Sequence, residues 1–318
     1  LVRQILLDEN PLTQQAQQTD WDNLPPALVA AGRSDLRSLQ QLYACTSQQI
    51  GQWVKAAANL ETVPVCWPDS DDAERSVLAV KSGDWGEAIA PLCAYYRQHG
   101  TGIFAQYRAL RWTETGLVGI SHPDPVRLSD LAGYVSQKQV FLENIEFLLS
   151  GNLALHVLLY GSRGSGKSSL VKAALNEFAD RNLRLIEVSK DRLKDLATIV
   201  DRLRDRPQKF IIFVDDLSFE EDDDAFKALK VVLEGSVTAR PENTIVCATS
   251  NRRHLIREFF DDRPRPRDAD EVHSWDTMQE KLSFSDRFGL TLTFEPADQE
   301  TYLEIVAHLA KQESIELE

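Results

Sequence analysis

A glycine-rich segment of eight residues constrains this chain more than any other feature of its sequence. Residues 161–168 read Gly-Ser-Arg-Gly-Ser-Gly-Lys-Ser, which fits the pattern G-x-x-x-x-G-K-[ST]. The apolar run 155–160 precedes the segment, and Leu170, Ala174 and Phe178 recur after it at helical spacing. We therefore predict a strand, a loop and a helix in that order, which is the arrangement that wraps backbone N–H groups around the phosphates of a nucleotide.

The residues of this loop have expected roles in phosphate binding. Its N–H groups are expected to close around the α- and β-phosphates, with partial positive charge from the helix N-terminus. Lys167 is expected to reach the β- and γ-phosphates, and the hydroxyl of Ser168 is expected to coordinate Mg²⁺. The predicted binding residues of the loop are Gly161, Ser162, Arg163, Gly164, Ser165, Gly166, Lys167, Ser168 and Ser169.

Composition bounds the class of protein. The chain has 318 residues, 43% of them hydrophobic and 26% charged, which suits two or three globular domains. Its apolar runs are shorter than the roughly 18–20 residues that cross a bilayer, so we expect no membrane span. The four cysteines lie far apart, which favours reduced thiols in the cytoplasm over disulfides or a zinc site. The histidines show no ligand spacing, so the Mg²⁺ that accompanies a nucleotide is the metal we expect.

The net charge of −14 bears on nucleic-acid binding. Non-specific binding to nucleic acid depends on Lys and Arg that neutralise phosphates, so an acidic chain is poorly suited to it. A local basic patch is still compatible with this total. The charge therefore weighs against a DNA motor without excluding one.

The first part of the chain differs in character from the rest. Residues 1–125 hold five of the six tryptophans, and the segments 36–43 and 85–96 have the spacing of short amphipathic helices. We predict a mainly helical N-terminal domain whose aromatic side chains form a core, and we expect it to bind an unidentified protein partner. The sequence His-Pro-Asp-Pro at 122–125 marks the expected domain boundary, because proline bars a helix and restricts the residue before it.

Strands and helices alternate from residue 126 onward. Beyond the strand that precedes the loop, the apolar runs predict strands at 184–188, 210–214, 244–249 and 290–294. Helices are predicted at about 191–204, 223–234 and 298–311. The run 210–214 is apolar throughout, which is typical of a parallel strand covered on both faces. The pattern predicts an α/β fold with a doubly wound sheet of five parallel strands, whose ligands bind beyond the carboxyl ends of the strands.

Two carboxylates directly follow the strand 210–214. Asp215 is predicted to hold Mg²⁺ through its water shell, since an acid buried beside a core strand is costly without a cation. Asp216 is a candidate for orienting or deprotonating the attacking water, and Glu220 is an alternative because Asp is one methylene shorter than Glu. The acidic run 220–224 has a second interpretation, as a solvated cap that complements the dipole of the next helix.

Two more polar side chains lie next to predicted strands. Asn251 follows the strand 244–249, where its amide can hold the attacking water against the γ-phosphate; the alternative is an ordinary turn residue. Arg287 precedes the strand 290–294, where an arginine can neutralise charge that develops on the γ-phosphate of a neighbouring subunit. The alternative for Arg287 is an ion pair with Asp286 or another local acid.

Together these motifs resemble those of the AAA+ ATPases. Residues 161–168 match the Walker A motif and residues 210–216 the Walker B motif, while 248–251 and 286–289 look like the sensor 1 and arginine-finger segments. The segment 128–134 is similar to the stretch that contacts adenine, with Gly133 and Tyr134 as the candidate contacts. The resemblance covers residues from about 126 to 311, and it is closest to a bacterial group of AAA+ ATPases of unknown function that carry a preceding helical domain.

The resemblance implies an ATP hydrolase with Mg-ATP bound between subunits of a ring or helical homo-oligomer. It implies a nucleotide-binding core at 126–296 and the start of a helical lid at 297–318, with most of the lid outside this chain and no sensor 2 residue assigned. Asn251 would sense the γ-phosphate, and Arg287 would complete the site of a neighbour. Two departures are the Asp at position 216, where most members have Glu, and the lack of a clear aromatic-hydrophobic pore loop.

Three functions are compatible with the sequence. The favoured one is an ATPase that uses hydrolysis to remodel or recruit a partner. The second is a nucleotide-gated binding module with slow or no hydrolysis, which Asp216 supports. The third is a DNA-associated loader or helicase accessory, which the acidic composition opposes.

Overall fold

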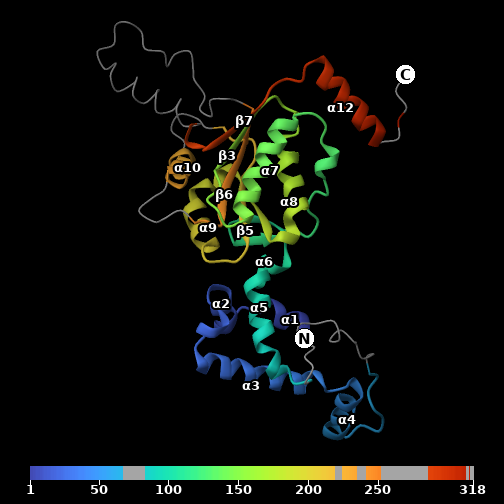
Figure 1. Ribbon diagram of the computed structural model, residues 1–318. Helices are drawn as coiled ribbons and strands as arrows, with labels where there is room; N and C mark the ends of the chain where they lie inside the picture. Colours follow the sequence, from blue (N-terminus) through green and yellow to red (C-terminus); the bar gives the residue numbers. More distant parts are fainter. Residues whose placement is uncertain (67–82, 219–223, 235–240, 252–285, 313–314, 316–318) are drawn as a thin grey trace. The chain divides into compact units, whose positions relative to one another are not determined.

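The computed structural model of the chain describes residues 1–66, 83–218, 224–234, 241–251, 286–312 and 315. The chain divides into two compact units, Leu1–Gln106 and Tyr107–Glu318 (Figure 1). The first unit is helical, and the second is built on a β-sheet. Within the described part of the chain, no helix is long and apolar enough to cross a membrane.

The described residues of the N-terminal unit are mainly helical. Its elements, with 3₁₀-helices written η, are α1 (Val2–Leu7), α2 (Pro11–Gln18), η1 (Trp21–Asn23), α3 (Pro26–Tyr43), α4 (Ser47–Ala58), η2 (Trp85–Ala88), α5 (Ile89–His99) and α6 (Gly102–Gln106). Asn10 and Thr13 exchange hydrogen bonds of 3.0 and 2.8 Å at the start of α2, and Thr46 and Gln49 form the same reciprocal cap at the start of α4. These caps satisfy backbone N–H groups that the first turn of a helix leaves without a partner.

Side chains of α1, α2, α3, η2 and α5 form the core of this unit. Trp85 and Tyr96 are buried, and the hydroxyl of Tyr96 donates a hydrogen bond of 2.6 Å to the carbonyl of Ile5. Trp53 on α4 is 60% exposed, so the aromatic core that we predicted does not include it. The helices predicted at 36–43 and 85–96 are confirmed as parts of α3 and of η2 with α5.

The second unit carries the segments predicted to bind nucleotide. Its elements are β1 (Ala109–Thr113), β2 (Gly116–Gly119), η3 (Leu128–Asp130), α7 (Val135–Leu149), β3 (Val157–Gly161), α8 (Lys167–Phe178), η4 (Ala179–Arg181), β4 (Leu183–Glu187), η5 (Lys190–Asp195), α9 (Leu196–Leu203), β5 (Lys209–Val214), α10 (Asp224–Glu234), β6 (Thr244–Ser250), β7 (Leu290–Phe294) and α12 (Gln299–Gln312). The five predicted strands correspond to β3, β4, β5, β6 and β7, and the α/β fold is confirmed.

The strands pair in the order β2-β1-β4-β5-β6-β3-β7. All the pairs are parallel except β1 with β2, which is antiparallel. Strand β6 therefore lies between β3 and β5, so the residues that follow these three strands meet at one edge of the sheet. Strand β7 pairs with the other side of β3, with Val157 opposite Leu290 and Gly161 opposite Phe294.

The structure corrects two predictions about the extent of this unit. The sheet has seven strands because β1 pairs with β4, Leu110 opposite Ile186, and β2 pairs with β1. The two units consequently divide between Gln106 and Tyr107, and the boundary predicted at residue 125 is too late. Trp112, which we grouped with the N-terminal aromatics, belongs to β1, and its indole N–H donates a hydrogen bond of 3.0 Å to Asp195.

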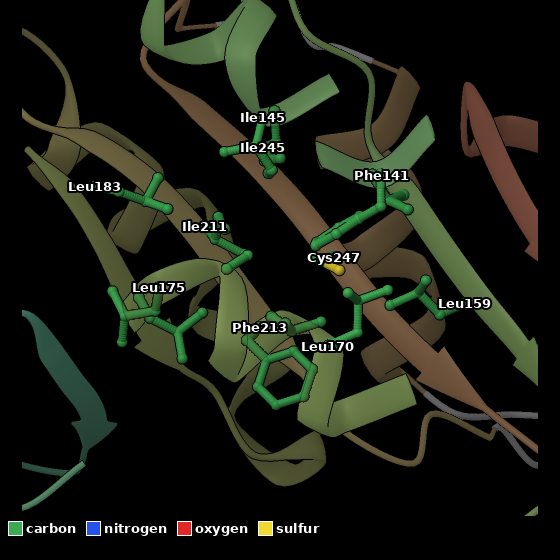
Figure 2. Packing of buried hydrophobic residues seen from close by; sticks show 14 of the residues in the cluster. Phe141, Ile145, Leu159, Leu170, Leu175, Leu183, Ile211, Phe213, Ile245 and Cys247 are labelled. Atoms are coloured by element: carbon green, nitrogen blue, oxygen red, sulfur yellow. The ribbon is translucent and has the colours of Figure 1, made fainter. Parts of the chain in front are cut away.

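Helices cover both faces of the sheet. Figure 2 shows one face, where Phe141 and Ile145 of α7 and Leu170 of α8 pack against Ile211 and Cys247 of the central strands. Helices α9 and α10 lie on the opposite face (Figure 1). Every residue of β6 is buried, as an apolar strand between two helical layers requires. This packing gives the carboxyl ends of β3, β5 and β6 a rigid support.

Candidate nucleotide-binding site

A cavity of about 310 Å³ lies at the carboxyl ends of β3, β5 and β6. The walls of the cavity are formed by these three strands and by the residues that follow them. A doubly wound sheet binds its ligands at this end of its strands. The residues that line it are Arg163, Gly164, Ser165, Gly166, Lys167, Ser168, Ser169, Asp215, Asp216, Thr249 and Asn251. The structure thus brings together the loop and the acidic and amide side chains that the sequence predicted for phosphate binding.

The glycine-rich loop joins the end of β3 to the start of α8. Gly161 has φ of 141°, and a Cβ atom there would lie 1.8 Å from the carbonyl oxygen of Phe294. That carbonyl also accepts a hydrogen bond of 3.0 Å from the N–H of Ser162. Gly166 has φ of 82° and caps α8, which begins at Lys167. The first glycine is therefore required by its close approach to β7, and Gly166 is required by its left-handed backbone.

The ammonium group of Lys167 lies against the loop itself. Its Nζ donates hydrogen bonds of 3.0 Å to the carbonyl of Gly161 and 2.6 Å to that of Ser162, and it lies 3.4 Å from Oδ1 of Asn251. Burial lowers the pKa of Lys167 from its ordinary value, and the nearby carboxylates of Asp215 and Asp216 oppose that shift. A partly buried cation at the loop is suited to an anionic ligand.

The side chains of Ser168 and Asp215 lie in contact in the lining of this cavity. The hydroxyl of Ser168 donates a hydrogen bond of 2.6 Å to Oδ1 of Asp215. The hydroxyl of Thr249 donates a short hydrogen bond to the same carboxylate oxygen, and it accepts one of 2.9 Å from the N–H of Asp216. A hydroxyl beside a carboxylate is the kind of hard oxygen site that Mg²⁺ prefers, so these residues fit the predicted metal.

Asp216 adopts a strained backbone conformation at the edge of the cavity. Its φ of 50° lies in the left-handed region, which is uncommon for a residue other than glycine. One of its carboxylate oxygens accepts a hydrogen bond of 2.7 Å from the amide of Asn251, and its N–H is held by Thr249. The two residues that the sequence predicted near the γ-phosphate are therefore in direct contact.

A second cavity of about 150 Å³ adjoins the loop and contains the predicted adenine contacts. Gly164, Ser165 and Gly166 line both cavities. Gly133 and Tyr134 line the second one; the hydroxyl of Tyr134 donates a hydrogen bond of 2.6 Å to the carbonyl of Glu295, and its ring lies 5.0 Å from that of Phe294. The other lining residues are Asp130, Leu131, Ala132, Lys138, Leu170, Phe294, Ile305, His308 and Leu309.

Arg287, another predicted site residue, lies away from this cavity. Arg287 does not line either cavity; it precedes β7, at the end of the sheet opposite the loop, because Leu290 pairs with Val157 and Phe294 pairs with Gly161. Four residue steps along a strand span roughly 13 Å. Glu220 lies outside the described residues. Arg287 is thus not part of the nucleotide cavity of its own chain.

The sequence did not identify two residues of the site, Thr249 and Phe294. Thr249 is 2% exposed and connects Asp215 with Asp216, although the sequence marked it only as part of the segment 248–251. A hydroxyl near the carboxyl end of a predicted strand was the available signal. Phe294 provides the carbonyl that holds the loop and a ring that lines the second cavity, and nothing in the local sequence points to either contact.

The doubly wound sheet, the glycine-rich loop at the start of α8 and the carboxylate that follows β5 are arranged as in a P-loop nucleotide-binding fold. The chain belongs to the family described as "Protein of unknown function (DUF815)", whose profile matches residues 105–318. The matched region begins within two residues of the boundary between the compact units, so it contains the whole sheet, β1 and β2 included.

Comparison with curated proteins found no match. Among solved structures, the chain is similar to the RuvB Holliday junction branch migration motor of Thermotoga maritima, with 18% identity and a TM-score of 0.41 over 61% of this chain and 56% of that one. Two single-residue variants of the same motor match with the same values. The chain spans a little over half the length of these structures.

Proposed function

We propose that this chain binds Mg-ATP in the cavity at the carboxyl ends of β3, β5 and β6 and hydrolyses it. The observation that carries the proposal is the convergence of Lys167, Ser168, Asp215 and Asn251 on one cavity beside a glycine-rich loop. These residues come from three separate strands or the segments that follow them. A cation, a hydroxyl, a carboxylate and an amide so arranged match what phosphoryl transfer needs.

Each side chain then has a defined task. Lys167 exchanges its hydrogen bonds to the loop carbonyls for bonds to the β- and γ-phosphates. Ser168 and Asp215 hold Mg²⁺, which when bound neutralises charge on the phosphates. Asp216 orients the attacking water, and Asn251, whose amide contacts Asp216, holds that water toward the γ-phosphate. Gly133 and Tyr134 contact the adenine.

The position of Arg287 supports a site shared between subunits. It lies at the opposite end of β7 from the loop of its own chain, so it reaches a γ-phosphate only in another copy. We therefore propose a ring or helical homo-oligomer in which Arg287 acts as an arginine finger for the neighbouring site. We further propose that the N-terminal unit binds the protein that hydrolysis remodels or recruits, and that the protein acts in the cytoplasm, where its cysteines remain thiols.

One observation favours a second function, that of a nucleotide-gated binding module. Asp216 has the shorter acidic side chain, and its carboxylate already accepts a hydrogen bond from Asn251. A carboxylate oxygen engaged in this way is less free to accept a hydrogen bond from the attacking water. In this alternative the chain binds ATP as a signal and hydrolyses it slowly or not at all.

The test is the rate of ATP hydrolysis per subunit, measured against protein concentration for the wild type, Lys167→Ala, Asp216→Asn and Arg287→Ala. We expect the wild-type rate to rise with concentration. Lys167→Ala should abolish nucleotide binding, and Arg287→Ala should retain binding but lose at least about tenfold in rate.

The outcomes separate the two functions. A low, concentration-independent rate with tight ATP binding, unchanged in Asp216→Asn, supports the binding module. An unchanged rate in Arg287→Ala contradicts its role in a neighbouring site. ATP binding that survives in Lys167→Ala contradicts the phosphate site itself.

A further inference from the structure

The N-terminal unit contains a cavity of about 570 Å³, which shares no lining residue with the two cavities described above. It lies within this unit and is lined by α1, α2, α3 and α5 together with the turn between α1 and α2. Its walls are mostly aliphatic, and Leu12, Leu36, Leu92 and Tyr96 of its lining belong to the buried core of the unit. A cavity of this volume with an apolar lining and a few polar groups is typical of a binding site.

One face of α3 gives the cavity the form of a groove. Leu28, Gly32, Leu36 and Leu39 line it at successive spacings of four, four and three residues, which is the spacing of one helix face. The eleven residue steps from Leu28 to Leu39 correspond to about 16 Å along the helix axis. A groove of that length beside a helix is matched in shape by another helix, laid along it with apolar side chains inward.

The charged side chains that line the groove have a single sign. Asp8 and Asp35 line it, both exposed, and the described lining contains no Lys, Arg or His. Asp8 accepts a hydrogen bond of 2.7 Å from the amide of Asn10, whereas Asp35 takes part in no hydrogen bond or ion pair with the described residues. Complementary charge on a binding partner would be positive.

We propose that this groove binds an amphipathic helix of a partner protein, with aliphatic side chains on its buried face and Lys or Arg beside them. The apolar lining supplies the area that such a helix buries, and Asp8 and Asp35 select its charge and orientation. The inference rests on the partner-binding role proposed above for the N-terminal unit. It does not depend on ATP hydrolysis.

The first test uses fluorescein-labelled model peptides and the whole 318-residue chain. One peptide of about 18 residues places Leu at helical spacing with Lys on the other face. A second replaces Lys by Glu, and a third scrambles the order of the first. In fluorescence anisotropy we expect saturable binding of the Leu/Lys peptide and at least about tenfold weaker binding of the other two. Equal binding of the scrambled peptide would overturn the proposal, because it would reflect charge alone.

The second test blocks the groove. Ala31→Trp places a large side chain in it, and Ala30→Trp is the matched control because Ala30 is exposed on the same helix but does not line the groove. We expect Ala31→Trp to weaken peptide binding at least about tenfold and Ala30→Trp to leave it unchanged, with equal helix content by circular dichroism. Binding that is the same in both variants would contradict the assignment.

The third test removes the charge of the groove. Asp8→Asn with Asp35→Asn should weaken binding of the Leu/Lys peptide by about tenfold, and Asp22→Asn with Glu61→Gln, which removes two exposed charges elsewhere in the unit, should not. If no peptide binds but the chain self-associates and Ala31→Trp abolishes that association, the occupant is a second copy and the proposal is wrong. We expect Lys167→Ala to bind the Leu/Lys peptide as the wild type does, because Lys167 does not line the groove. That result separates this inference from the proposal of nucleotide binding.

Discussion

The hydroxyl of Ser168 lies 2.6 Å from Oδ1 of Asp215, although the two residues are 47 positions apart in the chain. Ser168 stands in the first turn of α8, and Asp215 directly follows β5. Strand β6 separates β3 from β5, and its Thr249 donates a hydrogen bond to the same carboxylate oxygen. The side chains that follow β3 and β5 thus meet beside a hydroxyl of the intervening strand.

The first prediction concerns this pair as a metal site. In Asp215→Asn the anionic oxygen that would hold Mg²⁺ is lost, while the loop that binds the phosphates is retained. We expect the gain in ATP affinity on adding Mg²⁺ to fall by at least about tenfold, or about 1.4 kcal/mol. Titration of a fluorescent ATP analogue in Mg²⁺ and in EDTA measures that gain. If Mg²⁺ raises the ATP affinity of the wild type and of Asp215→Asn by the same factor, Asp215 is not a metal ligand.

The second prediction concerns Thr249 as a positioning residue. Thr249→Val has the same shape but leaves the N–H of Asp216 without its acceptor and removes one of the two hydroxyl groups that donate to Asp215. We expect kcat to fall by about 10- to 100-fold while ATP affinity stays within about threefold. We also expect a loss of about 1–3 kcal/mol in the free energy of unfolding, because a buried polar group loses its partner.

Rescue by Thr249→Ser separates positioning from general stability. The serine hydroxyl restores both hydrogen bonds and loses only a methyl group, so kcat should return to within about threefold of the wild type. Steady-state kinetics and urea unfolding on the three proteins provide the comparison. A loss of stability in Thr249→Val without a change in kcat would assign Thr249 a purely structural role.

The third prediction compares two glycines of the loop. In Gly161→Ala the new Cβ atom would lie 1.8 Å from the carbonyl oxygen of Phe294, so β7 or the loop must move. We expect a loss of about 3 kcal/mol or more in the free energy of unfolding. In Gly164→Ala the Cβ atom meets nothing within 4 Å, and only the left-handed φ of 75° opposes it, so we expect a loss of about 1–2 kcal/mol.

Urea unfolding of the two alanine variants measures this difference. The midpoint should fall further for Gly161→Ala, with the same slope against denaturant in both variants. Equal destabilisation would mean that backbone conformation alone, and not the contact with Phe294, makes glycine necessary at position 161.

The fourth prediction is a pH dependence of ATP binding. Burial lowers the pKa of Lys167 in the free protein, and a bound triphosphate would favour the charged ammonium and raise that pKa. Binding then takes up a proton at pH values between the free-protein pKa and the higher pKa of the complex, so ATP affinity should be constant below the free-protein pKa and fall as pH rises through it. The fall should begin at a lower pH than the titration of an ordinary lysine.

Isothermal titration calorimetry between about pH 8 and pH 10, at fixed ionic strength, measures this decline. Adenosine is the control ligand, because it carries no phosphate for Lys167 to contact and its affinity should not change over the same range. A constant ATP affinity throughout would show that Lys167 does not change its protonation on binding.

The strands that carry the site were predictable because each is a short apolar run with its polar residue at the end. Strand β5 is buried along nearly its whole length between two helical layers, and such a strand must be apolar throughout. The predicted run 210–214 matches β5 (Lys209–Val214), and the run 290–294 matches β7. Because Asp215 directly follows β5, the sequence alone placed it at the correct edge of the sheet.

Strands β1 and β2 were not predictable in the same way. They form a short hairpin at one edge of the sheet, where Arg111 and Val118 remain exposed, so neither strand needs a continuous apolar run. The pairing of β1 with β4 joins Leu110 to Ile186, and nothing in the local pattern of either segment specifies the other. The domain boundary was placed too late for this reason.

The sequence by itself determined the class of fold and the identity of the loop, because a glycine-rich turn between an apolar strand and a helix is specified by residues that are neighbours in the chain. Only the tertiary structure decided that Thr249 joins Asp215 to Asp216, that the carbonyl of Phe294 lies against Gly161, and that Arg287 lies away from the cavity beside the loop of its own chain. These relationships connect residues far apart in sequence. They depend on the order and register in which the strands pair, which no local pattern encodes.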